Sequence, residues 1–168
     1  MRAVLLVTCA AAVMVCGGAF SATITVVPPV AAGGFARPLS GARLTQGFGC
    51  TSFALEPVDP HCPGGHWHSG VDLAAAAGTP VCATLDGVAR VFITATGYGL
   101  YVVIDHGGGL SSLYAHLSSV AVSSGGVVAT GQVIGSVGSS GNSTGPHLHF
   151  EIRRDGIAED PLTDMRLP

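Results

Sequence analysis

Hydrophobic residues recur in short runs that are separated by glycine-rich turns. The runs have the length of strands and span residues 81–85, 88–94, 100–106, 110–117, 132–137 and 147–153. Asp86-Gly87 predicts a tight hairpin between the first two runs, and Gly107-Gly108-Gly109 predicts another. No stretch keeps the 3.6-residue apolar period of a helix. The pattern predicts an all-β fold with little helix, in which antiparallel sheets form a sandwich or a partly closed barrel.

The last predicted strand places two histidines on one face. In a strand, side chains alternate, so His147 and His149 point one way while Leu148 and Phe150 point the other. Neutral imidazole binds zinc and also transfers protons near pH 7, so the pair supplies a ligand, a catalyst, or one of each. The same alternation puts Glu151 on the histidine face, either to orient a ligand or as an ordinary surface acid.

A second segment adds a carboxylate to these imidazoles. His68 and Asp72, four residues apart, have the same strand parity and are expected to face the same side. With one imidazole from the final strand they make a two-histidine, one-carboxylate set, which leaves a zinc coordination position open for water. Alone, the two residues are equally consistent with a surface hydrogen bond.

A third segment presents His116. Alternation predicts that Leu113 and Ala115 pack on the core, while Tyr114 and His116 occupy the opposite, free face. A histidine there either orients an attacking water and stabilises an oxyanion, or is a half-buried group bonded to a loop carbonyl. Because three segments each present ionisable side chains, we favour a hydrolytic site.

Composition narrows the class of partner. The 168 residues fit one domain and are 48% hydrophobic and 10% charged, with a net charge of −3 and no lysine. The scattered arginines form no basic patch for phosphate backbones, so we expect no nucleic-acid partner.

The first 32 residues have the features of a targeting segment. Arg2 precedes an apolar stretch at 3–15, and small residues follow at 17–22. We expect export, by a cleaved signal peptide or by an uncleaved membrane anchor, with a linker completing residues 1–32 and one domain at 33–168. A membrane contact is expected only if this segment stays uncleaved.

Cysteines bracket a long loop. Cys50 and Cys62 enclose a stretch rich in proline and acidic residues, which we expect to be an ordered wall of a cleft and to be closed by a disulfide in an oxidising compartment. The alternative makes Cys62 a zinc ligand together with His61 or His66. Cys82 lies in a predicted strand, where a buried thiol is expected.

Three ordered motifs carry a family resemblance. They are His68-x-x-x-Asp72 leading into Gly78-Thr79-Pro80-Val81, then Tyr114-Ala115-His116-Leu117, then Gly138 to Glu151 with the sequence GSSGNSTGPHLHFE. From about residue 39 to 161 the chain resembles the lysostaphin and LytM-type zinc endopeptidases of bacterial cell walls. The resemblance implies that His68, Asp72 and His149 bind Zn²⁺, and that His116 and His147 are catalytic.

The resemblance also implies a fold and a substrate. It implies a β core of the duplicated-hybrid-motif type with a loop-walled groove, and peptidoglycan stems or cross-bridges as substrate for a secreted or wall-associated enzyme, expected to be a monomer. Some family members act only as non-catalytic binding or activating modules, which is the alternative function. Hairpins joined by glycine turns also occur in phosphocarrier and lipoyl-type domains. Those domains are cytoplasmic, whereas the predicted leader indicates export. The Cys50–Cys62 loop is longer than a minimal member requires, so the scissile bond stays open.

Overall fold

The structure, a computed structural model, describes residues 34–165, and the expected leader therefore lies outside the described residues. The elements are β1 (Arg43–Gln46), β2 (Gly49–Thr51), β3 (His66–His68), β4 (Val71–Ala74), β5 (Pro80–Cys82), β6 (Gly87–Ile93), β7 (Leu100–Gly107), β8 (Leu110–Ala115), β9 (Leu117–Val120), β10 (Val127–Val128), β11 (Val133–Val137), β12 (His147–Arg154), β13 (Ile157–Glu159) and α1 (Pro161–Met165).

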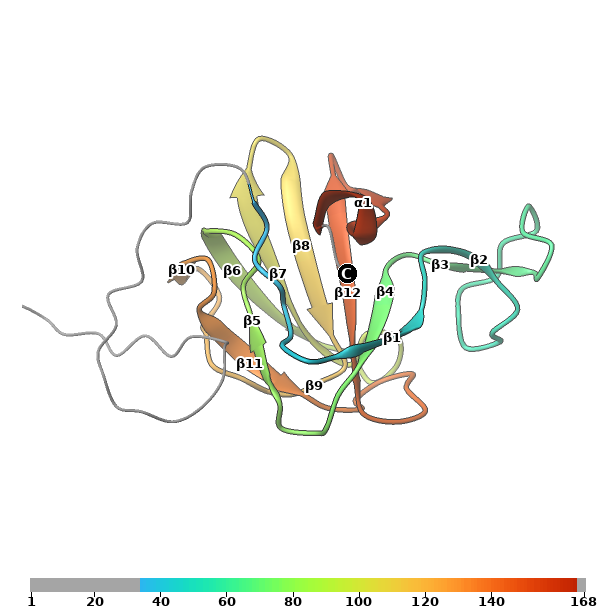
Figure 1. The fold of residues 1–168 in the computed structure, drawn as a ribbon, viewed down its shortest axis with the longest axis horizontal. Helices are drawn as coiled ribbons and strands as arrows, with labels where there is room; N and C mark the ends of the chain where they lie inside the picture. Colours follow the sequence, from blue (N-terminus) through green and yellow to red (C-terminus); the bar gives the residue numbers. More distant parts are fainter. Residues whose placement is uncertain (1–33, 166–168) are drawn as a thin grey trace, which may run out of the picture.

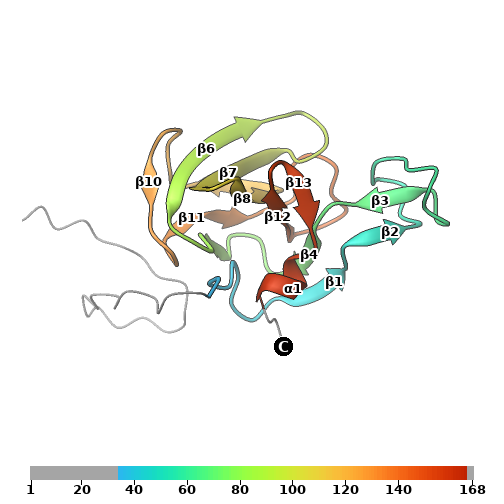
Figure 2. The same cartoon turned by 90° about the horizontal axis from the view of Figure 1, so that it is seen from above.

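Two antiparallel sheets form the body of the fold (Figures 1 and 2). The large sheet has the order β1-β4-β12-β8-β7-β6-β10, with β13 beside β12, and the small sheet has the order β5-β11-β9. The β2–β3 pair projects from one end of the molecule. The large sheet keeps β1 and β10 as separate edges and is not a closed barrel. The predicted all-β class with little helix is confirmed.

The core lies between the two sheets. It combines Val81, Leu117 and Ile134 of the small sheet with Leu148 and Phe150 of β12, all at most 1% exposed. The alternation in β12 is as predicted, because the apolar residues of this strand face the core while its histidines face away. Burial of the apolar face therefore fixes which side of the large sheet carries the polar residues.

Of the two predicted hairpins, one is present in the structure and the prediction of the other is wrong. β7 and β8 pair across the glycine turn at 107–109 as predicted. β5 instead pairs with β11, and β6 pairs with β7 and β10, so Asp86-Gly87 connects two different sheets. The Asp86 carboxylate accepts hydrogen bonds from the amide and hydroxyl of Thr130 at 2.6 and 2.7 Å. These bonds hold Asp86 in the crossover from β5 to β6. The Asp86-Gly87 dipeptide alone is equally consistent with a hairpin.

The predicted faces of β8 are also corrected. Tyr114 lies opposite Phe150 in the strand register and is fully buried in the core. Leu113 and Ala115 lie opposite Glu151 and His149, on the face expected to be polar. His116 follows the strand with φ of 60°, at the corner where the chain passes from β8 to β9. Its direction is therefore set by the turn rather than by strand parity.

The cysteine loop is closed as expected. Cys50 and Cys62 form a disulfide, with Cα atoms 5.2 Å apart, so the alternative in which Cys62 binds zinc is wrong. Cys82 is fully buried, as expected.

We expect the double change Cys50→Ser, Cys62→Ser to lower the free energy of unfolding by about 3 kcal/mol, because the disulfide restricts the unfolded chain over a separation of 12 residues. Urea unfolding of the variant and of the unaltered protein measures the difference. Coincident transitions would show that the disulfide adds no stability.

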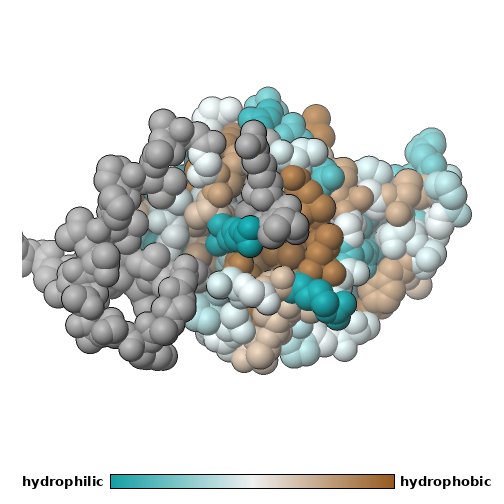
Figure 3. Space-filling model, in the orientation of Figure 1, coloured by the Kyte–Doolittle hydropathy of each residue, from teal (hydrophilic) through white to brown (hydrophobic). Residues whose placement is uncertain are grey.

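The surface is mixed in polarity. On the face in Figure 3, the most hydrophobic surface lies near the middle of the view and is bordered by polar residues.

The helix α1, which follows β13, is five residues long. Among residues 34–165, no helix has the length and hydropathy needed to cross a bilayer.

Candidate functional site

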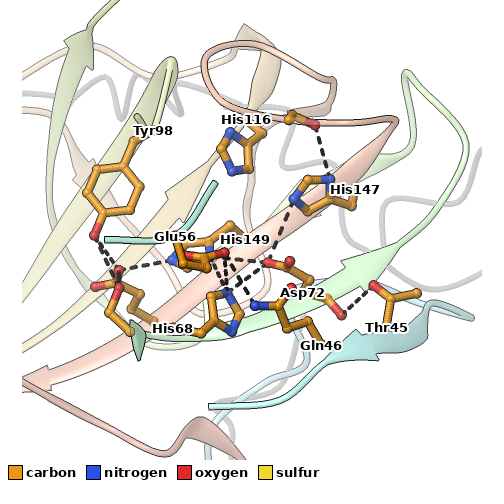
Figure 4. Close-up of polar contacts among 12 residues, drawn as sticks. Thr45, Gln46, Glu56, His68, Asp72, Tyr98, His116, His147 and His149 are labelled. Carbon is orange, nitrogen blue, oxygen red and sulfur yellow. Dashed lines mark hydrogen bonds and ion pairs between the residues drawn. The ribbon is translucent and has the colours of Figure 1, made fainter. Parts of the chain in front are cut away.

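Three buried side chains from three strands converge, each from a position at or near the end of its strand (Figure 4). His68 ends β3, Asp72 lies in β4, and His149 lies beside Asp72 in the paired strand β12. His68 Nε2 is 2.9 Å from His149 Nδ1, and Asp72 Oδ1 is 3.2 and 3.1 Å from those two nitrogens. β3 and β4 belong to different sheets, so the Ser69-Gly70 connection, rather than shared strand parity, brings His68 and Asp72 together.

Gly70 has a steric reason to be glycine. A Cβ atom at this position would collide with the backbone carbonyl of Phe150 and would lie 2.9 Å from Cγ of Glu151. Only glycine lets the connection between β3 and β4 pass this close to β12. The close approach carries His68 onto the same site as His149.

Hydrogen bonds define which nitrogen each of these histidines presents. His68 Nδ1 lies 2.8 Å from the carbonyl oxygen of Gly47, which only accepts, so Nδ1 carries the hydrogen and Nε2 faces the cluster. His149 Nε2 lies 2.9 Å from a carboxylate oxygen of Glu151, so Nδ1 faces the cluster. The inward-facing atoms of His68, Asp72 and His149 all lie within 4.8 Å of one another.

The cluster is electrostatically coupled. Burial disfavours the charged form of His149, but hydrogen bonds to Asp72 and Glu151 outweigh it and raise the pKa of His149 to about 9. Burial likewise opposes ionisation of Asp72, but its contacts with the His149 and His68 imidazoles outweigh burial and hold the pKa of Asp72 well below the usual range. A carboxylate therefore faces two imidazole nitrogens in a water-poor site.

This donor set fits a zinc ion. Two imidazole nitrogens and one carboxylate oxygen are ligands that Zn²⁺ prefers, and three protein ligands are the usual number where a coordination position stays open. All three residues are at most 8% exposed, so a divalent cation would offset the buried negative charge of Asp72. Among the described residues, they form the one cluster with metal-ligand geometry.

His116 and His147 lie next to this cluster, with their ring centres 4.7 Å apart. His116 Nδ1 is 2.8 Å from the carbonyl oxygen of Ser140, and His147 Nδ1 is 2.8 Å from that of Gly145. Both Nδ1 atoms therefore carry hydrogen, and both Nε2 atoms are left as acceptors. His147 Nε2 lies 3.7 Å from Asp72 Oδ1, which places it beside the three-residue cluster.

His116 is held in its neutral form. Burial is the main cause that lowers its pKa, to about 4, and the nearby His147 and His149 act in the same direction. In the unfolded chain its pKa is near 6.5. Between these pH values the unfolded state binds a proton that the folded state does not, so lowering the pH favours unfolding.

We therefore expect the free energy of unfolding of the metal-free protein to fall as the pH decreases from 6.5 to 4, with His116 contributing on the order of 3 kcal/mol. His116→Asn, whose amide can still donate to Ser140, should have a shallower dependence. Urea unfolding at several pH values measures both slopes. Equal slopes in the two proteins would contradict the assignment.

A groove of about 320 Å³ runs beside the cluster. Phe53 and Glu56 of the disulfide-closed loop line one part, and residues 142–146, before β12, line another. Asp72, His116 and His147 also face it. The expected loop-walled groove is present, with the candidate chemistry on its lining.

Several residues that contribute to the site lie outside the predicted motifs. Glu56 Oε1 lies 3.8 Å from His68 Nε2 and accepts a hydrogen bond from Gln46 at 3.3 Å. Tyr98, in the β6–β7 turn, donates to Glu151 at 2.6 Å, and burial raises the Tyr98 pKa to about 12. Their local sequences carry no signal, because tertiary contacts alone bring these loops to the site.

The structure also locates Glu151 and His66, the two other residues that were considered near the site. Glu151 is fully buried and contacts His149, so its interpretation as a surface acid is wrong. His66, which the alternative paired with Cys62 as a zinc ligand, lies outside the three-residue cluster, with Nδ1 2.8 Å from the carbonyl oxygen of Glu56.

Comparison with known sequences identifies related proteins. The profile of peptidase family M23 matches residues 66–161. The chain is 43% identical over 134 residues to the DD-carboxypeptidase/endopeptidase Mpg of Neisseria meningitidis, in a match covering 78% of this chain and 29% of that protein. It is 47% identical over 92 residues to the murein hydrolase activator EnvC of Escherichia coli, covering 55% of this chain and 22% of that one. The chain thus spans less than a third of these curated relatives.

Solved structures are similar as well. A zinc-containing peptidase from Vibrio cholerae matches with a TM-score of 0.59 and 34% identity, over 70% of this chain and 35% of that one. The catalytic domain of lysostaphin, an antimicrobial peptidase from Staphylococcus simulans, matches with a TM-score of 0.61 and 32% identity, over 75% and 93%. Both similarities extend across most of the described β fold.

Proposed function

The chain belongs to peptidase family M23, and on this premise we propose that it is a zinc-dependent endopeptidase that hydrolyses peptide bonds in peptidoglycan stems or cross-bridges. One observation carries the proposal: His68, Asp72 and His149 present three converging donor atoms beside two further histidines in an open groove. In this proposal the first three residues bind Zn²⁺.

His116 and His147 are proposed to handle protons during hydrolysis. When bound, zinc supplies Lewis-acid chemistry, which activates a water and polarises a carbonyl group. The acceptor atom Nε2 of either histidine can take a proton from the attacking water, and a protonated Nε2 can donate to the developing oxyanion or to the leaving amine. Their backbone partners, Ser140 and Gly145, hold the required tautomer.

The domain arrangement and location belong to the same proposal. Residues 1–32 are proposed to direct export as a signal peptide or anchor, and residues 33–168 to form the peptidase domain. The Cys50–Cys62 disulfide supports an oxidising, extracytoplasmic compartment, because such bonds are rare in the cytosol. Peptidoglycan peptides are the proposed partner at the groove.

An activating or binding module without catalysis is the second candidate. The similarity to EnvC, a protein named as a murein hydrolase activator, favours it. The complete set of three donor residues and two histidines favours catalysis instead. The two candidates differ in whether the purified protein alone cleaves peptidoglycan.

Incubation of the zinc-loaded protein with purified peptidoglycan tests the proposal. We expect new amino termini, their loss after treatment with a chelator, and recovery when zinc is restored. Mass spectrometry of the soluble fragments identifies the bond that is cut. Binding to peptidoglycan without any cleavage product would favour the module, and activity that persists without metal would contradict the zinc mechanism.

A further inference from the structure

The carboxylate of Glu151 is the most heavily hydrogen-bonded group near the site. Its side chain is fully buried in β12, two residues after His149. Oε1 accepts hydrogen bonds from Ser69 Oγ at 2.6 Å and from the Tyr98 hydroxyl at 2.6 Å, besides contacting His149 Nε2 at 2.9 Å. Oε2 accepts from Arg153 Nε at 2.5 Å.

These donors come from three parts of the chain. Ser69 belongs to the β3–β4 connection, Tyr98 to the β6–β7 turn and Arg153 to β12 itself. A guanidinium nitrogen of Arg153 also donates to the Tyr98 hydroxyl at 3.1 Å. A buried carboxylate is costly unless it is paired and hydrogen-bonded, and this one has both kinds of partner. The Glu151 side chain is therefore fixed in one position.

The fixed carboxylate determines which ring nitrogen of His149 carries hydrogen. An ionised carboxylate only accepts hydrogen bonds, so His149 Nε2 must carry hydrogen and Nδ1 is the nitrogen left for a metal. His68 differs, because the neutral carbonyl of Gly47 contacts its Nδ1 and it presents Nε2. Of the two imidazoles, only that of His149 has a charged partner on its outer nitrogen, which makes it the more basic ligand.

We propose that Glu151 is a positioning residue that makes His149 bind the metal through Nδ1, and that Ser69, Tyr98 and Arg153 hold Glu151 for this purpose. This inference rests on the proposed metal site but goes beyond it. It assigns a role to one buried carboxylate and predicts opposite nitrogens as ligands in the two histidines. Glutamine at position 151 would offer one acceptor oxygen where the carboxylate offers two, and its amide group would face Arg153 or the other donors.

Competition with a chromophoric chelator measures the zinc affinity of Glu151→Gln. We expect the dissociation constant for zinc to rise by about 10- to 100-fold, as is typical when a partner of a metal-bound histidine is lost. Glu159→Gln is the matched control, because Glu159 pairs with Arg154 on the neighbouring strand and is only partly buried. It should bind zinc as the unaltered protein does. Tyr98→Phe, which keeps the carboxylate and removes one donor, should show a smaller loss.

Nitrogen NMR of the unaltered, zinc-loaded protein gives a readout that does not require any variant to fold. We expect His149 to have metal on Nδ1 and hydrogen on Nε2, and His68 to have the reverse. Zinc bound through His149 Nε2, or equal zinc affinities for Glu151→Gln and Glu159→Gln, would overturn the inference. Failure of the unaltered protein to bind zinc would instead overturn the proposed function, so the two failures are distinguishable.

Discussion

Replacement of His149 by alanine is expected to abolish zinc binding and hydrolysis together. The change removes one of three converging donor atoms and leaves His68 and Asp72, which are too few to retain the ion against solvent. Because a bound zinc ion would supply several kcal/mol of transition-state stabilisation, activity should fall by about a thousandfold or more. Metal analysis after gel filtration and a peptidoglycan cleavage assay measure the two losses.

His61→Ala provides the control for this experiment. His61 is exposed in the disulfide-closed loop and lies outside the three-residue cluster. The control should bind one zinc ion per chain and remain active. A His149→Ala protein that keeps its zinc would contradict the ligand assignment, whatever happens to its activity.

Replacement of His147 by alanine is expected to separate zinc binding from turnover. His147 Nε2 lies beside Asp72, but His147 is not one of the three proposed ligands and instead pairs with His116. The three proposed ligands therefore remain intact in the variant. Loss of a positioned proton-transfer group should lower kcat by about 100- to 10,000-fold. Zinc content should stay at the level of the unaltered protein.

The pair of variants decides between two uses of the final strand. His147 and His149 are one residue apart on the same face of β12, and sequence spacing alone allows either to be the ligand. Zinc content of both variants, measured side by side, separates them. Equal zinc loss in the two proteins would mean that both imidazoles bind metal and that the proposed division of roles is wrong.

Period-two alternation predicted the strand that carries the site, because burial of Leu148 and Phe150 leaves their neighbours on the other face. The same reasoning assigned Tyr114 to the wrong face. β8 lies between β7 and β12 in the large sheet and is covered on both sides, so polarity no longer indicates which side is exposed. Tyr114 keeps its hydroxyl in the core through contacts with Thr84 and Ser112.

The remaining features depend on contacts that local sequence does not contain. Asp86-Gly87 has the composition of a hairpin turn, yet contacts with Thr130 make it a crossover between sheets. Tyr98 and Glu56 reach the site from loops whose course is set by the whole fold. Strand alternation located Glu151 correctly, but its burial depends on Ser69, Tyr98 and Arg153.

The central claim is that His68, Asp72 and His149 bind one zinc ion. Crystals of the zinc-loaded protein, measured on both sides of the zinc absorption edge, test it most directly through the anomalous difference map. We predict a single strong peak about 2 Å from His68 Nε2, an Asp72 carboxylate oxygen and His149 Nδ1, with the Nε2 atoms of His116 and His147 outside coordination distance. A peak coordinated by His116 or His147, or no peak among the three proposed ligands, would contradict the claim.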